Sequence, residues 1–148
     1  MSRHALAPWV LTLALAAVAW GALGPELQKA LTDAKYVYIQ SERRSGELSK
    51  PAEIWFFDEG GVVYVGTRPT SFRVQRIKAG HAKARIAVGT PGGPSFEATG
   101  KLVKDTALEG RLMAAFAKKY PDGWARYADG FRDGFKSGDR VVVAYTPR

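Results

Sequence analysis

The chain has no cysteine and only two histidines, His4 and His81. Without cysteine it can form no disulfide framework, no thiolate zinc or iron–sulfur site and no cysteine nucleophile. A serine–histidine–aspartate triad would depend on His81 alone, because His4 belongs to the N-terminal segment considered below. The sequence also lacks a histidine or carboxylate cluster with metal-ligand spacing, a Walker A motif and a Rossmann glycine fingerprint. Any enzymatic chemistry is therefore expected to come from a bound cofactor, with no metal site.

The length and composition are those of one globular domain. A chain of 148 residues buries roughly two-thirds of its unfolded surface, and the apolar share of 46% and charged share of 24% are ordinary. Arg3 is the only charged side chain in 1–22, so the net charge of +8 belongs almost entirely to the remaining chain. Such a surplus favours an anionic partner: a phosphate-bearing cofactor, nucleic acid or an anionic membrane surface.

The first 24 residues have the pattern of a targeting segment. A short basic start is followed by a run without charge from Ala5 to Gly24. This is typical of a secretory signal, and the small residues Gly21 and Ala22 allow cleavage after either of them. The run is also long enough to cross a bilayer as an uncleaved anchor. A buried N-terminal helix is the third interpretation.

We therefore predict that residues 1–22 are a signal peptide or a membrane anchor, with anchoring through residues 5–24. The basic start orients the rest of the chain away from the cytoplasm by the positive-inside rule. The protein is then exported, to the periplasm or the medium, or anchored facing outward. The absence of cysteine is consistent with an oxidising compartment.

Residues 25–148 are predicted to form one mainly β domain. Runs of β-branched and aromatic residues predict six strands, over 35–41, 52–58, 62–67, 84–89, 95–104 and 140–145. Helical patterns cover 25–34, 70–79, 105–119 and, after a break at 120–123, the aromatic stretch 124–135. The last strand is uninterruptedly β-branched and is expected to be central and buried. Together these elements predict a six-stranded antiparallel barrel with short helices, without a domain linker or an internal repeat.

The order of these elements, from about Tyr36 to the C-terminus, resembles the pyridoxamine 5′-phosphate oxidase-like split barrels. That family has flavin-binding members and deazaflavin (F420)-dependent members. The residues that match its pattern of strands, glycine turns and a basic helix start are Gly46, Pro51, Trp55, Phe56, Gly61, Thr67, Ser71, Arg73 and Arg76. One departure is Gly80-His81, where family members often have Asn-Pro. Cofactor geometry nearby could therefore differ.

The segment 67–78 carries the groups that a phosphate needs. The hydroxyls of Thr67 and Ser71 and the guanidiniums of Arg68, Arg73 and Arg76 are hydrogen-bond donors next to a helix start. Helical spacing places Arg73 and Arg76 close to one face. The alternative is that these cations form a solvated helix face.

The resemblance implies that a flavin-type ring lies against the second strand, at the interface of a homodimer. The implied contacts are Glu53, Ile54, Trp55 and Phe56, largely through backbone groups. Trp55 is equally suited to core packing, and the Glu53 carboxylate faces either the ring or solvent. The sequence identifies no catalytic residue.

The resemblance therefore predicts an FMN- or F420-dependent oxidoreductase that acts on a small organic substrate. The alternatives are a non-catalytic barrel that binds a flavin or haem, and a basic domain that docks on an anionic surface. Nucleic acid is not an expected partner, because the chain is predicted to be exported and lacks the interleaved aromatic pattern of single-strand binders.

Overall fold

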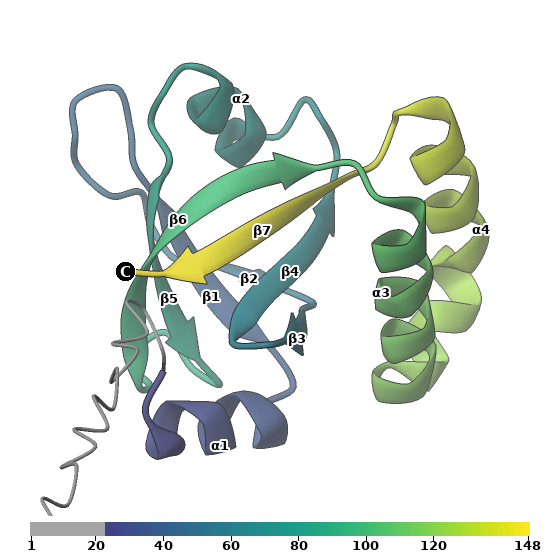
Figure 1. The fold of residues 1–148 in the computed structure, drawn as a ribbon, viewed down its shortest axis with the longest axis horizontal. Helices are drawn as coiled ribbons and strands as arrows, with labels where there is room; N and C mark the ends of the chain where they lie inside the picture. The colour runs from purple at the N-terminus through teal and green to yellow at the C-terminus, as the bar shows by residue number, and fades with distance from the viewer. Residues whose placement is uncertain (1–22) are drawn as a thin grey trace, which may run out of the picture.

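The β-branched and aromatic runs fold into a curled sheet of seven antiparallel strands, accompanied by four helices (Figure 1). The computed structural model describes residues 23–148, so the predicted signal peptide or anchor at 1–22 lies outside the described residues. Every helix within 23–148 is too short or too polar to span a membrane. The predicted mainly β class is confirmed, with seven strands in place of six.

The strands are β1 (Val37–Ser41), β2 (Ala52–Ile54), β3 (Phe57–Glu59), β4 (Val62–Thr67), β5 (Lys83–Val88), β6 (Ser95–Val103) and β7 (Val141–Pro147). The helices are α1 (Pro25–Asp33), α2 (Phe72–Lys78), α3 (Thr106–Lys119) and α4 (Pro121–Ser137). The order in the sheet is β2-β1-β5-β6-β7-β4-β3. The predicted central position of the last strand is confirmed, because β7 pairs with both β6 and β4.

The extra strand arises because the single strand predicted over 52–58 is divided. β2 pairs with β1 and β3 pairs with β4, so two strands that follow each other in the chain lie at opposite edges of the sheet. Trp55 and Phe56 connect them. This two-residue connection joins the two edges of the curled sheet, and we call it the seam of the barrel. β2 and β3 share no hydrogen-bonded ladder across it.

The barrel interior is filled by alternating apolar side chains of the strands. β1 buries every second residue, and β6 does so over most of its length, as expected for strands with one face on a core. Val37, Ile39, Val65 and Ile86 are among the fully or almost fully buried residues. Helix α1 packs against β5 at one end of the barrel, and α2 lies at the other end (Figure 1).

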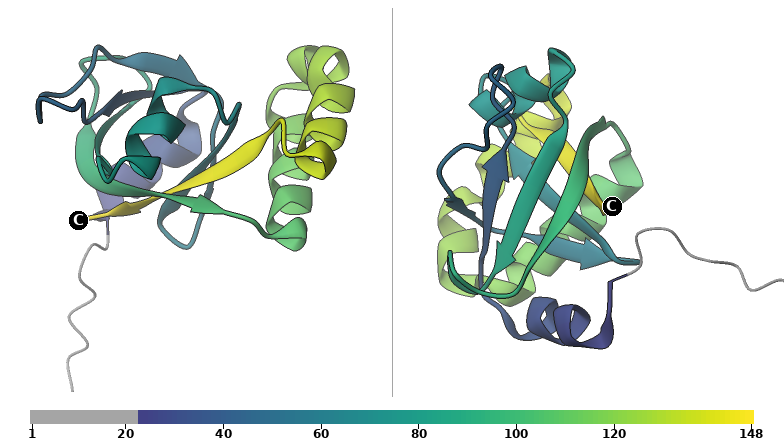
Figure 2. Two further views of the ribbon diagram at one scale, coloured as in Figure 1. Left: turned by 90° about the horizontal axis from the view of Figure 1, so that it is seen from above. Right: turned by 90° about the vertical axis from the view of Figure 1, so that its left-hand side faces the viewer.

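Helices α3 and α4 form an antiparallel pair beside the barrel (Figure 2). Asp105, where the predicted helical pattern begins, caps α3, since its carboxylate accepts a hydrogen bond from the Leu108 backbone nitrogen at 3.0 Å. The predicted break over 120–123 is shorter in the structure. Only Tyr120 lies between the helices, because proline fits the first turn of a helix and Pro121 already begins α4.

Candidate functional site

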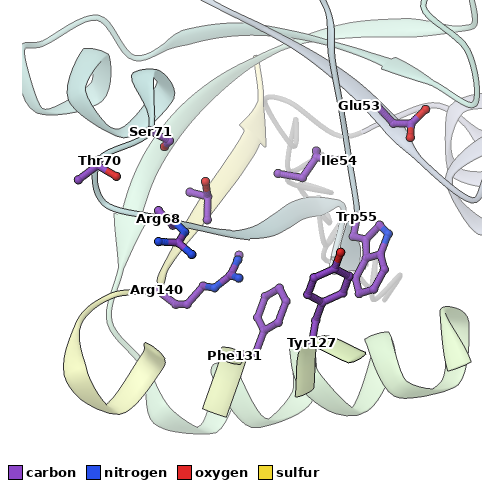
Figure 3. Close-up of a pocket in the computed structure, with 11 residues that line it drawn as sticks. Glu53, Ile54, Trp55, Arg68, Thr70, Ser71, Tyr127, Phe131 and Arg140 are labelled. Carbon is purple, nitrogen blue, oxygen red and sulfur yellow. The ribbon is translucent and has the colours of Figure 1, made fainter. Parts of the chain in front are cut away.

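A cavity of about 500 Å³ opens between the seam of the barrel, the end of β4 and helix α4 (Figure 3). Its lining residues are Glu53, Ile54, Trp55, Gly66, Thr67, Arg68, Thr70, Ser71, Tyr127, Phe131 and Arg140. We call it the aromatic cavity, because Trp55, Tyr127 and Phe131 form one side of it.

Two glycines allow this aromatic wall to form. A Cβ atom on Gly66 of β4 would lie 2.7 Å from Cε1 of Phe131, and a Cβ on Gly123 of α4 would lie 2.6 Å from Cζ2 of Trp55. Both distances are far below van der Waals contact, so only glycine lets the helix and the strand approach these rings. Trp55 also stacks on Tyr120, with centroids 4.3 Å apart and planes 8° from parallel. Trp55 therefore both packs in a core and lines the cavity.

Polar side chains occupy the opposite part of the aromatic cavity. Thr67 ends β4, and Arg68, Thr70 and Ser71 follow it in the loop that enters α2. Arg140 comes from the turn between α4 and β7, and its guanidinium carbon lies 4.3 Å from the Phe131 ring centroid. A flat ligand with hydrogen-bond acceptors would find an apolar wall and a polar wall here.

Glu53 lies at the far end of the cavity from the two arginines (Figure 3). Its carboxylate is exposed and accepts a hydrogen bond of 2.6 Å from the hydroxyl of Tyr38, the residue opposite it on β1. This bond raises the pKa of the Tyr38 phenol. Of the two orientations expected for Glu53, the structure has the exposed one, while the residue still borders the cavity.

A second cavity, of about 490 Å³, lies on the other side of Ser71. We call it the basic cavity. It is lined by Ile39, Ser41, Arg43, Ser49, Lys50, Ala52, Ser71, Phe72, Arg73 and Arg76. Four cations and three serines contribute to it, and none of its lining residues is acidic. It is therefore suited to a ligand with negative charge.

Two donors of residues that line the basic cavity have no hydrogen-bond partner within residues 23–148. The Ser71 hydroxyl stands at the N-cap of α2 but makes no capping bond, and its oxygen and Nη1 of Arg73 are buried without a hydrogen bond. Arg76 donates from Nη1 to the hydroxyl of Ser41 at 2.6 Å, which fixes its guanidinium against β1. Buried polar groups are rarely left unpaired, so the Ser71 hydroxyl is a position where a ligand's acceptor would bind. The Arg73 guanidinium also lies beside the Tyr145 phenol, whose pKa is raised by burial and in part held down by this neighbouring charge.

The residues predicted from sequence fall into three places. Six of them line the aromatic cavity, namely Glu53, Ile54, Trp55, Thr67, Arg68 and Ser71. Arg73 and Arg76, again with Ser71, line the basic cavity. The Phe56 side chain is fully buried in the barrel core, outside both cavities.

Three further residues line the aromatic cavity without having been predicted from the sequence, namely Tyr127, Phe131 and Arg140. Their one signal is the repeated Asp-Gly-Phe at 129–131 and 133–135. Glycine is unfavourable inside a helix, and of these two glycines Gly134 is required, because a Cβ atom there would lie 2.3 Å from Cγ of Arg140, whereas Gly130 faces open space. Within 23–148 no group of three or more histidine or acidic side chains could hold a metal ion.

Neither a protein-family model nor a curated protein sequence matches the chain. Solved structures share its fold. A conserved hypothetical protein from Mycobacterium tuberculosis superposes with a TM-score of 0.64 at 14% identity, over 87% of this chain and 84% of that one. A proposed pyridoxamine 5′-phosphate oxidase from Listeria innocua gives 0.61 at 13% identity, over 83% and 91%. The haem storage protein HutZ from Vibrio cholerae gives 0.60 at 15% identity, over 86% and 91%.

At these identities the similarity establishes the fold. The chain has the split-barrel fold that the sequence resemblance predicted, and proteins described as an oxidase and as a haem store both have it.

Proposed function

We propose that the protein is an FMN- or F420-dependent oxidoreductase that acts on a small organic substrate. The observation that carries this proposal is the junction of the two cavities at Ser71. The aromatic cavity on one side of Ser71 would suit the flat ring of such a cofactor, and the basic cavity on the other side would suit its phosphate-bearing tail. When bound, such a ring accepts and returns a hydride, chemistry that no side chain here can supply.

The residues present fit the phosphate of that cofactor. The buried Ser71 hydroxyl and Arg73 Nη1 have no partner among the described residues, and Arg76 is fixed beside them. These three residues would bind the phosphate, and Thr67 and Arg68 would contact the tail where it leaves the aromatic cavity. Glu53, Ile54 and Trp55 would border the ring. The chain's contribution is to bind and orient the cofactor and to exclude water from the ring face.

We further propose that the protein acts as a homodimer, exported or anchored through residues 5–24. Phe72 at the rim of the basic cavity is 77% exposed, and Tyr127 at the rim of the aromatic cavity is 46% exposed. Large aromatic side chains in water favour a covering partner, and a second copy of the chain would cover both cavities.

The similarity to HutZ makes haem binding the second candidate. A haem iron needs a protein ligand, commonly histidine, cysteine, methionine or tyrosine. Tyr127 is the only one of these side chains among the lining residues of the two cavities. A haem complex would therefore depend on Tyr127. An unchanged haem spectrum in a Tyr127→Phe variant excludes haem ligation by Tyr127 in the aromatic cavity.

The deciding experiment is the absorbance spectrum of the purified protein, followed by titration with FMN and with F420. We expect binding of one of them at micromolar affinity. Replacing Arg73 and Arg76 together by alanine should weaken it by several kcal/mol, since charge-assisted hydrogen bonds contribute about 1.5–3 kcal/mol each. The Arg44→Ala/Lys78→Ala variant removes the same charge outside both cavities and should bind normally. If neither cofactor binds, the oxidoreductase proposal is wrong.

A further inference from the structure

Two arginines face each other at one end of the aromatic cavity. β4 pairs with β7 in a register that places Thr67 opposite Val141, so Arg68 and Arg140 meet one residue beyond the end of this ladder. Both line the cavity, and Figure 3 shows their guanidiniums next to each other. Like charges at opposite positions of neighbouring strands repel each other, so this arrangement is unfavourable by itself.

No carboxylate within residues 23–148 neutralises the pair. The ion pairs of this part of the chain involve other cations. Asp133 and Asp139 line a neighbouring cavity together with both arginines, but they lie beyond ion-pairing distance. Glu53 lies at the other end of the aromatic cavity (Figure 3). The two guanidiniums thus lie next to each other without an ion-paired carboxylate from the described residues (Figure 3).

The position of Arg140 is fixed by its surroundings. Its backbone nitrogen donates to the carbonyl of Gly134 at 3.0 Å, and its guanidinium lies over the Phe131 ring. A Cβ atom on Gly134 would lie 2.3 Å from Cγ of Arg140, so glycine is required for this placement. Burial and the nearby charge of Arg68 lower the pKa of Arg140. An arginine held in place against a like charge is preorganised for an anion.

We propose that Arg68 and Arg140 bind the oxyanion of the small-molecule substrate, a carboxylate or phosphate group, while its flat apolar body lies along Phe131 and Tyr127. Planar guanidiniums suit either oxyanion through paired hydrogen bonds. The identification of this ligand as the substrate rests on the proposed function, because it would then meet the cofactor ring in the same cavity. Binding of the anion itself does not depend on a cofactor.

The pair is distinct from the cations assigned to the cofactor's phosphate, while Arg68 also borders the proposed path of the cofactor's tail. Arg73 and Arg76 line the basic cavity, beyond Ser71, whereas Arg140 borders only the aromatic cavity and the smaller cavity behind it. We assign Arg73 and Arg76 to the phosphate of the cofactor, and Arg68 with Arg140 to the oxyanion of the substrate. The substrate class is therefore a small aromatic or conjugated acid. A neutral molecule of the same shape would not offset the repulsion between the Arg68 and Arg140 guanidiniums.

Saturation-transfer NMR on the full chain, free of cofactor and at low salt, tests this with benzoate, phenyl phosphate and the neutral benzyl alcohol. We expect at least one of the anions to bind, and benzyl alcohol to bind at least about tenfold more weakly, the effect of one lost charge-assisted contact. Arg140→Gln and the exposed Arg68→Gln should each cause a similar loss. Arg126→Gln, on the outer surface of α4, is the matched control and should bind normally.

Three results of this NMR experiment would overturn the inference. They are equal binding of benzyl alcohol and the anions, no binding of either anion, and equal affinity in the Arg140→Gln and Arg126→Gln variants. FMN titration of the same variants separates it from the proposed function. Anion binding without any cofactor binding leaves the arginine site standing and removes the oxidoreductase. Loss of FMN binding in Arg140→Gln, with FMN retained in Arg73→Ala/Arg76→Ala, would assign the pair to the cofactor's phosphate and overturn the inference.

Discussion

The hydroxyl of Tyr120 accepts a hydrogen bond from the backbone nitrogen of Phe56 at 3.1 Å and donates one to the carbonyl of Lys35 at 2.7 Å. Phe56 lies in the connection between β2 and β3, where no neighbouring strand offers its N–H a partner. A side chain from the junction of α3 and α4 thus completes the seam of the barrel. Trp55, which borders the aromatic cavity, stacks on the same tyrosine ring.

Removing this hydroxyl should destabilise the fold. In a Tyr120→Phe variant the buried N–H of Phe56 loses its acceptor, so we expect the free energy of unfolding to fall by about 1–3 kcal/mol. Urea denaturation followed by circular dichroism measures the change. Tyr127→Phe removes a hydroxyl at an exposed position and serves as the control. Equal stability of the two variants would contradict the role of Tyr120.

The stability of the protein should depend on the ionisation of Lys119. Its Nζ lies 3.4 Å from the centroid of the Phe56 ring, and burial lowers its pKa from 10.5 to about 8. At pH 7 the amine is charged in both the folded and the unfolded state, so folding bears the full desolvation cost. Between pH 8 and 10.5 the folded state loses its proton first, and this cost disappears.

A Lys119→Met variant should therefore be more stable than the parent at pH 7, and the gain should shrink by pH 10. The gain stays below the full desolvation cost because the lysine is only half buried and water screens it. Lys118→Met, at an exposed neighbouring position, should show no such pH dependence. Denaturant titrations of all three proteins at both pH values test this. The same gain at pH 7 and pH 10 would exclude the deprotonation of Lys119 as its cause.

Two glycines of α4 should respond in opposite directions to replacement by alanine. Gly130 has no atom near the position of a Cβ, so Gly130→Ala should stabilise the helix by up to about 1 kcal/mol. Gly123→Ala has the same helix benefit but places its methyl group 2.6 Å from the Trp55 ring. We expect it to lower the melting temperature and to alter tryptophan fluorescence. Stabilisation by both substitutions would mean that Trp55 does not need this close approach.

The proposed dimer should depend on Phe72. A Phe72→Asp variant places a charge at a side chain that is 77% exposed, so the monomer should fold normally while self-association is weakened. Analytical ultracentrifugation over a range of concentrations measures this. Thr90→Asp, in the exposed turn between β5 and β6, is the control. A dimer of unchanged strength would place the interface away from α2.

The sequence predicts those parts of the fold that depend on local pattern. Strand β4 and the helix that begins at Pro25 carry their own signals, in β-branched residues and in a proline followed by an acidic first turn. The segment 52–58 is most strongly β-forming over 54–57, where the structure divides it, so its division between two edges of the sheet depends on pairing partners far away in the chain. Local propensity cannot reveal that division.

The candidate site shows the same limit. The basic start of α2 marks Ser71, Arg73 and Arg76 in the sequence, and the structure brings all three to one cavity. Arg140 carries no comparable signal, because its role in the site depends on the register between β4 and β7. That register places Arg140 opposite Arg68. Residue patterns supplied the order of the elements, on which the family resemblance rests, while the pairing of these two charges requires three-dimensional structure.

The divided strand at the seam also bears on solubility. The two outermost strands of the sheet, β2 and β3, have three residues each, where an undivided strand would have presented one long edge. A short edge offers few unpaired N–H and C=O groups to a strand from another molecule, so it is a poor template for edge-to-edge aggregation. The break after Ile54, next to Trp55 of the aromatic cavity, thus also protects the barrel from pairing with strands of other molecules.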